Sequence, residues 1–168
     1  MDEANFWEIV RLAHDQSGGD MEKKCEAVRN HISKLSTEEA EAFGHLFDAM
    51  MDKAYSWPLW GAAYIIGCGC GDDAFSDFRA SLISRGRGAF ERAISDPDSL
   101  AEEAFDEGAW FYEGYHYAVS EGVESAAGKR CPRAVPHPSS PSGQKRSEKN
   151  VTQLYPNLSA KFITQGDL

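Results

Sequence analysis

The sequence has few cysteines and no long hydrophobic run. Its four cysteines, Cys25, Cys68, Cys70 and Cys131, are too few for a disulfide-rich fold, and two of them are only two residues apart. No apolar stretch approaches the ~20 residues that a membrane-spanning helix needs. The N-terminal residues are acidic and lack the basic and apolar regions of a secretory signal. We therefore expect a cytoplasmic protein with reduced thiols that does not associate with a membrane.

Basic residues are scarce in the first three quarters of the chain. Residues 1–128 contain 25 acidic and 10 basic side chains, whereas residues 129–168 contain 2 acidic and 7 basic ones. An acidic body repels nucleic-acid phosphates, so we expect it to bind no nucleic acid. The basic tail can attract an anionic partner, but contact with its own acidic body is favoured because an intramolecular contact costs less entropy.

The sequence also lacks the sustained alternation of polar and apolar residues that marks a β-strand. Apolar residues instead recur every three or four positions, as at Phe43, Phe47 and Met50, which predicts helices with one buried face. A chain of this length buries about 70% of its unfolded surface, enough for a core without metals or disulfides. We expect an all-α fold: a single compact multi-helix domain over residues 1–128, a flexible Pro/Ser-rich linker over 129–150, and a C-terminal segment, 151–168, that packs back on the domain.

Capping residues, prolines and glycines mark the expected helix boundaries. Asp2, Asp20 and the capping box Ser36–Glu39 open the first three helices. Proline suits the first turn of the next helix, residues 57–66, which is apolar nearly all round. Further helices are expected from a cap at Asp72 or Asp73 to Gly86, around residues 90–94, from Ser99 to about Glu107, and from Trp110 to Gly128.

The most unusual stretch lies between Tyr55 and Arg87. An aromatic segment is followed by the loop Gly-Cys-Gly-Cys-Gly (residues 67–71), then by two aspartates that open an aromatic helix. The two cysteines are spaced more tightly than zinc ligands usually are, and the five histidines form no companion pair, so we expect no metal. The loop lacks the lysine and Ser/Thr of a P-loop, and its aspartates repel anions. We therefore expect no phosphate site and no cofactor.

Asp72 and Asp73 are the candidates for a functional site. One carboxylate is expected to cap its helix, while the other faces a pocket walled by aromatic side chains. Paired carboxylates serve acid/base catalysis when burial separates their pKa values, and they also bind a cation, an amine or an arginine. The structural alternative is that both aspartates fasten the loop, with Arg79 as an internal ion-pair partner. Caps and structural ion pairs of this kind are commoner than sites.

Several short segments form a family-like pattern: Phe6-Trp7, Leu59–Tyr64, Cys68–Phe75, Phe78–Gly86, Pro97–Leu100 and Leu154–Phe162. Together they resemble a bacterial family known as domain of unknown function 4240. Ser81 and Ser159 stand where the family pattern has tryptophan, so a pocket walled by those tryptophans would be wider or absent here. The family has no established activity, and its members occur beside a Trp-Gly-Arg-type domain in larger regulatory proteins, which implies an interaction role.

These observations favour a cytoplasmic binding or regulatory module that contacts another protein or a small cationic ligand. The alternative is a small, hydrolase-like enzyme in which Asp72 or Asp73 acts as a general base. The expected contact surface consists of Trp60, Tyr64, Asp72, Asp73, Arg79 and Glu113.

Overall fold

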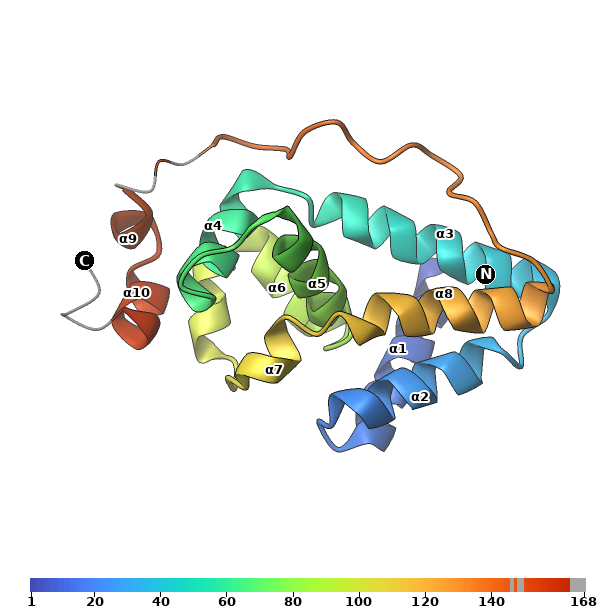
Figure 1. The fold of residues 1–168 in the computed structure, drawn as a ribbon. Coiled ribbons are helices and arrows are strands. Elements are labelled where there is room, and N and C mark those ends of the chain that lie inside the picture. The colour runs from blue at the N-terminus through green and yellow to red at the C-terminus, as the bar shows by residue number, and fades with distance from the viewer. Residues whose placement is uncertain (146, 148–149, 164–168) are drawn as a thin grey trace.

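The structure is a computed structural model that describes residues 1–145, 147 and 150–163. It confirms the expected all-α class. In the described part of the chain, the pairing of Ser56 with Ser142 is the one strand-like bridge, and no helix there has both the length and the apolar character to cross a membrane. The helices are α1 (Glu3–Ser17), α2 (Met21–Ile32), α3 (Thr37–Lys53), α4 (Trp57–Ile66), α5 (Asp72–Ile83), α6 (Arg87–Ser95), the 3₁₀-helix η1 (Pro97–Glu102), α7 (Glu107–Trp110), α8 (Gly114–Ala127), α9 (Val151–Leu154) and α10 (Pro156–Phe162) (Figure 1).

Four helices form a bundle at one end of the molecule. α8 packs against both α2 and α3, and α2 also packs against α1 (Figure 1). The buried faces follow the predicted spacing, and Phe6 of α1 meets Phe43 of α3 with ring centroids 4.8 Å apart. Gly122 permits the close approach of α8 to α2, because a Cβ there would lie 3.0 Å from Cβ of Ile32 and 3.2 Å from the Arg29 carbonyl oxygen.

The shorter helices gather at the other end of the molecule, with α5 at their centre (Figure 1). α5 packs against α4, α6 and α7 as well as against α3 and α8 of the bundle. Its inward residues Phe75, Phe78, Leu82 and Ile83 are fully buried, as their helical spacing predicts. α5 therefore joins the two halves of the fold into one core.

Local capping signals correctly predicted the first three helix starts. The Asp2 carboxylate accepts the Asn5 amide at 2.8 Å, and the Asp20 carboxylate accepts the amide three residues later at 2.9 Å. Ser36 and Glu39 form the complete capping box, because each side chain accepts the backbone amide of the other. These contacts satisfy amides that would otherwise lack partners, which is why such short motifs predict helix boundaries well.

The prediction of a helix from Ser99 to about Glu107 is wrong. The chain instead forms the shorter η1, which starts at Pro97 and is capped by Asp96. The Asp96 carboxylate accepts the Asp98 amide at 3.2 Å, two residues ahead, and Glu103 is already extended. The cap begins the turn three residues earlier than the capping-box pattern at Ser99 indicates.

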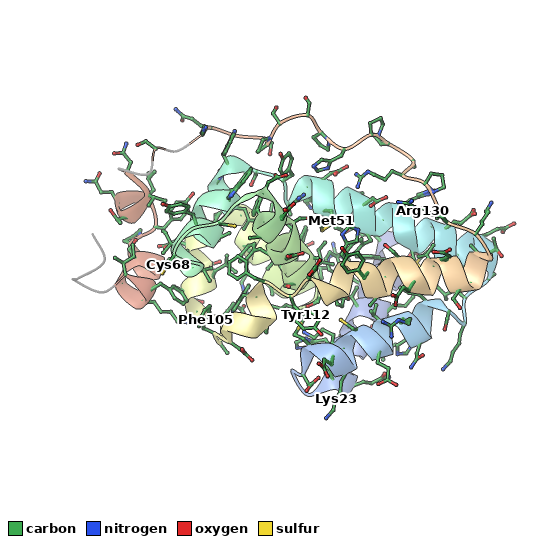
Figure 2. The ribbon with its side chains drawn as sticks, viewed as in Figure 1. Lys23, Met51, Cys68, Phe105, Tyr112 and Arg130 are labelled. Atoms are coloured by element: carbon green, nitrogen blue, oxygen red, sulfur yellow. The ribbon has the colours of Figure 1, made fainter. Side chains whose placement is uncertain are left out.

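The predicted start of the long helix at Trp110 is also wrong, because α8 begins only at Gly114. The backbone breaks between α7 and α8, at the position of Tyr112 in Figure 2. The Tyr112 amide donates to the Ser81 hydroxyl oxygen at 3.0 Å instead of to a helical carbonyl. A contact with a residue on another helix therefore overrides the local helical pattern.

The basic segment after α8 runs along α3 (Figure 1). Arg133 donates to the carboxylates of Asp48 (3.0 Å) and Asp52, and Lys129 lies 3.1 Å from Glu41. These ion pairs confirm the expected contact between the basic tail and the acidic body. They are partly exposed, so each contributes little free energy to holding this segment against α3.

Candidate functional site

Five aromatic rings form a column through the short-helix half of the protein. Trp57 stacks on Trp60 at 5.3 Å, and Trp60 stacks on Phe75 at 4.7 Å between ring centroids. Phe75 is followed by Phe78 at 6.3 Å and Phe78 by Trp110 at 5.6 Å, with all four interplanar angles at or below 21°. We call these five residues the aromatic column. Because its rings come from α4, α5 and α7, the column fixes these helices relative to one another.

A cation lies against each end of the aromatic column. The Lys145 ammonium is 4.9 Å from the Trp57 ring centroid, and the Arg85 guanidinium carbon is 3.8 Å from the Trp110 ring centroid. Cation–π contacts contribute about 0.5–2 kcal/mol, most when they are desolvated. The Arg85 contact is the more buried one, and burial lowers the pKa of that guanidinium.

Arg79 lies beside the aromatic column and is almost fully buried. Its guanidinium donates to the Met51 carbonyl oxygen at 2.9 Å, where the end of α3 meets α5 (Figure 2). The same group lies 4.7 Å from the Tyr55 ring centroid and 5.1 Å from that of Phe75. Burial lowers its pKa, a shift that the charge of Asp72 opposes.

The interpretation of Arg79 as the ion-pair partner of Asp72 and Asp73 is therefore wrong. Its hydrogen bonds go to the carbonyl oxygens of Met51 and Phe75. With 4% of its surface exposed, the side chain pins α5 to α3 and offers little to a ligand.

The prediction that Asp72 or Asp73 caps α5 is also wrong. Gly71 is the N-cap residue, in an extended conformation, and its helix end has no side-chain cap. Both aspartates are exposed in the first turn, where the positive end of the helix dipole favours carboxylates by about 0.3–1 kcal/mol. Neither carboxylate forms a hydrogen bond with the described residues, so the pair does not fasten the loop in the way expected.

The aromatic hollow is a surface cavity of about 210 Å³ on α4. Trp60 and Tyr64 line it together, as expected from their spacing of one helical turn, and both are half-buried. The Trp60 indole donates to the Cys70 carbonyl oxygen at 2.8 Å, which holds the loop against α4. Asp72, Asp73 and Glu113 do not line this hollow. Its lining is completed by Trp57, Gly61, Cys70, Lys145, Ser147 and Val151.

The glycine-cysteine loop turns sharply because Gly67 has no side chain. A Cβ at Gly67 would lie 2.8 Å from the Gly69 carbonyl oxygen and 2.9 Å from the Phe111 ring. Cys68, labelled in Figure 2, adopts a positive φ of 50°, and Gly69 follows with a φ of 124°. Burial raises the pKa of the Cys70 thiol to about 11, so this cysteine stays protonated and is a poor nucleophile. The described residues contain no group of three or more potential ligands placed to hold a metal ion.

A separate acidic edge is formed by Asp73, Asp77 and Glu113. Burial, together with the charges of Glu113 and Asp73, raises the pKa of Asp77 to about 6. Glu113 accepts a hydrogen bond from the Tyr117 hydroxyl at 3.2 Å, which orients it on this side of the molecule. Sequence reasoning missed Asp77, although its spacing of four residues from Asp73 places like charges on one helix face.

Replacing Asp77 with asparagine is expected to stabilise the protein at neutral pH. Because the folded pKa of Asp77 is raised, the folded protein holds this proton more tightly than the unfolded chain between pH 4 and 6, so stability falls as pH rises through that window. D77N should therefore match the wild type near pH 4 and exceed it by about 1 kcal/mol at pH 7, after allowance for solvent screening. Urea unfolding at several pH values measures this difference. Glu113→Gln removes one of the charges that raise the pKa of Asp77, so the pH range over which stability falls should become narrower. A difference between D77N and wild type that does not change with pH would contradict the raised pKa of Asp77.

The family model described as "Protein of unknown function (DUF4240)" matches residues 1–125. The chain belongs to this family. Searches of the curated proteins and of the solved structures find no match. The DUF4240 match includes the whole aromatic column and the acidic edge, whereas the basic linker, α9 and α10 lie outside it.

Ser81 and Ser159, the two serines expected to replace tryptophans of the family pattern, have structural roles in this chain, and only Ser81 lies within the DUF4240 match. Ser81 is fully buried, and its hydroxyl accepts the Tyr112 amide, which positions the turn leading to Glu113. Ser159 donates to the Thr152 carbonyl oxygen at 3.2 Å and so links α10 to α9. Neither serine lines the aromatic hollow.

Proposed function

We propose that this DUF4240 protein is a binding module for another protein, with the aromatic hollow and the acidic edge as its contact surface. The aromatic hollow carries the proposal, because it exposes part of Trp60 and Tyr64 on one face of α4. Tyrosine and tryptophan provide large, rigid contact areas and dominate the binding energy of many interfaces. The aromatic hollow and the acidic edge adjoin. Cys70 lines the hollow, and the charge of Asp77, on the edge, helps to raise the pKa of its thiol.

The chemistry of this surface favours a partner segment that combines an apolar side chain with a basic one. A volume of about 210 Å³ accommodates a side chain and not a drug-sized molecule. The carboxylates of the acidic edge attract lysine or arginine, and a small cationic ligand is the simpler form of the same partner. We place this module in the cytoplasm, a location that fits its four free cysteines.

The alternative of a small, hydrolase-like enzyme has less support. A general base needs a desolvated carboxylate beside a substrate cavity, whereas Asp72 and Asp73 are exposed and lie outside the aromatic hollow. The raised pKa of Asp77 is the one feature that favours acid/base chemistry, and it belongs to a residue on the open acidic edge.

A peptide selection tests the proposed binding surface. A random-peptide phage library is selected on the immobilised full-length protein, and we expect enriched peptides that pair Lys or Arg with an aromatic or aliphatic residue. Tyr64→Ser, and separately the double variant Asp73→Asn/Asp77→Asn, should weaken an enriched peptide at least tenfold. Glu124→Gln on the exposed face of α8 is the matched control and should retain the affinity. Enriched peptides without a basic bias, or full binding to Tyr64→Ser, would refute the proposal.

A further inference from the structure

The C-terminal helix α10 is capped by a residue of the body. Asp98 of η1 is 8% exposed, and its carboxylate accepts the Asn157 amide at 3.1 Å and the Leu158 amide at 2.9 Å. The Asn157 side chain donates a third hydrogen bond to the same carboxylate at 2.8 Å. The N-cap residue of α10, Tyr155, supplies no side-chain cap of its own. Asp98 thus performs for α10 the function that an N-cap side chain performs within one helix.

Proline at position 156 suits this arrangement. It occupies the first turn of α10, where its missing N–H costs no hydrogen bond and its fixed φ already matches the helix. The next two amides, those of Asn157 and Leu158, are the ones that Asp98 accepts. Hydrogen bonds to a charged acceptor are about twice as strong as neutral ones, so a short segment gains a defined register from them.

Tyr155 makes the second contact, on α4. Its hydroxyl donates to the Pro58 carbonyl oxygen at 2.6 Å, and 3% of its surface is exposed. The ring lies so close to Gly61 that a Cβ there would be 2.7 Å from the tyrosine hydroxyl oxygen and 2.9 Å from a ring carbon. Only glycine at position 61 therefore leaves room for the ring.

Two further contacts complete the packing of residues 155–161, called the tail below, against the body. Leu158 is fully buried. The Lys161 ammonium donates to the carbonyl oxygens of Ala101 (2.8 Å) and Glu103 (2.7 Å) at the end of η1. All these contacts come from seven consecutive residues, 155–161. We call their counterpart on the body, formed by Pro58, Gly61, Asp98, Ala101 and Glu103, the α4–η1 surface.

We propose that the α4–η1 surface is a recognition site for protein segments of the form Tyr-Pro-Asn-Leu, which the chain's own tail occupies until a partner protein supplies the same segment. The inference goes beyond the proposed function, because it concerns a second contact surface and a partner segment of different chemistry. The four residues of this motif are bound by one carboxylate, one glycine and the Pro58 carbonyl, and Lys161, three residues later, donates to two further carbonyls. The α4–η1 surface lies within the DUF4240 match, and the tail that covers it lies outside.

The tether makes the tail a strong competitor. Ser142, whose backbone is hydrogen-bonded to that of Tyr55 and Trp57, precedes Tyr155 by 13 residues. A tether of this length gives the tail an effective concentration in the millimolar range. An external segment therefore binds weakly to the wild type and much more tightly once the tail contacts are removed. The same competition excludes a second copy with an identical tail at micromolar concentrations.

The test uses full-length protein and a fluorescein-labelled synthetic peptide of residues 150–163, followed by fluorescence anisotropy. The double variant Tyr155→Ala/Leu158→Ala should bind the peptide at least tenfold more tightly than the wild type. Adding Asp98→Ala to it should weaken binding at least tenfold. Leu154→Ala, at an exposed tail residue, is the matched control and should behave as the wild type. If the double variant does not fold, Asn157→Ala, which removes one hydrogen bond to Asp98, should still bind about threefold more tightly than the wild type.

The outcomes separate this inference from the proposed function. Equal peptide affinity in the wild type and both tail variants, or binding that does not depend on Asp98, overturns the inference. Dimers of the wild type at micromolar concentration that disappear in Asp98→Ala would identify a second copy as the occupant and overturn the partner assignment. Tyr64 shares the aromatic hollow with Gly61 and with Val151 of the peptide, so the separating variant is Asp73→Asn/Asp77→Asn, whose two carboxylates lie outside that hollow. This double variant should not change binding of the 150–163 peptide, so failure of the phage selection and failure of this titration are distinguishable results.

Discussion

Alanine at position 79 is expected to lower the free energy of unfolding by about 3 kcal/mol or more. The substitution removes the donor that satisfies the buried Met51 carbonyl, and an unsatisfied buried acceptor costs about 1–3 kcal/mol. It also leaves a cavity between Tyr55 and Phe75, because the long side chain is 4% exposed, and such cavities add about 2 kcal/mol or more. Urea unfolding followed by circular dichroism measures the difference.

Methionine at the same position separates the two contributions. Arg79→Met fills much of the space between the two rings but cannot donate to the Met51 carbonyl, so we expect about half of the alanine loss. An alanine variant within 1 kcal/mol of the wild type would contradict the structural role of Arg79. If the alanine variant lost binding of the selected peptides while its stability stayed unchanged, Arg79 would belong to the contact surface, as the sequence analysis expected.

The parts of the fold that depend on neighbouring residues could be predicted from the sequence. The side chains of Asp2, Asp20 and Ser36 each accept the backbone amide three residues ahead. The sequence pattern therefore contains both partners of the contact. The start of α8 depends instead on Ser81, 31 residues before the amide that it accepts. No local pattern contains that information.

The candidate site was predicted in part, for a similar reason. Trp60 and Tyr64 share one face of α4 because they are four residues apart, and both line the aromatic hollow. Asp72 and Asp73 are adjacent, so a helix directs them to different sides, and only Asp73 belongs to the acidic edge with Asp77. The burial of Arg79 among aromatic rings depends on the distant Met51 carbonyl, which the sequence does not reveal.

The packing of the tail was predictable in part from neighbouring residues and in part depends on a distant contact. Apolar residues return after residue 150, which indicated a C-terminal segment able to pack back on the domain. No local signal marks Asp98 as a cap for the tail, because its own amide belongs to the turn that Asp96 caps. Its carboxylate serves the tail instead, and this capping across about 60 residues emerges only once η1 and α10 are packed together.

Alanine at position 75 is expected to have the largest effect of the single substitutions, a loss of about 3–5 kcal/mol in the free energy of unfolding. Phe75 is fully buried and stacks between Trp60 and Phe78 at the middle of the aromatic column. Its removal opens a cavity behind the aromatic hollow and removes one of the two rings beside the Arg79 guanidinium. Urea unfolding gives the size of the loss, and a red shift of tryptophan fluorescence reports the exposure of Trp60.

Leucine is the matched control at this position, because it keeps most of the volume and loses only the ring stacking. We expect Phe75→Leu to cost about 1–2 kcal/mol, since stacked pairs add about 0.5–1.5 kcal/mol beyond burial. Equal losses for leucine and alanine would show that ring stacking, and not filled volume, holds the aromatic column together. Because Trp60 rests on Phe75, the leucine variant should also weaken peptides that bind the aromatic hollow, while the tail peptide keeps its affinity for the α4–η1 surface. Weakening of both ligands would show that the two surfaces on α4 are coupled through its packing on α5.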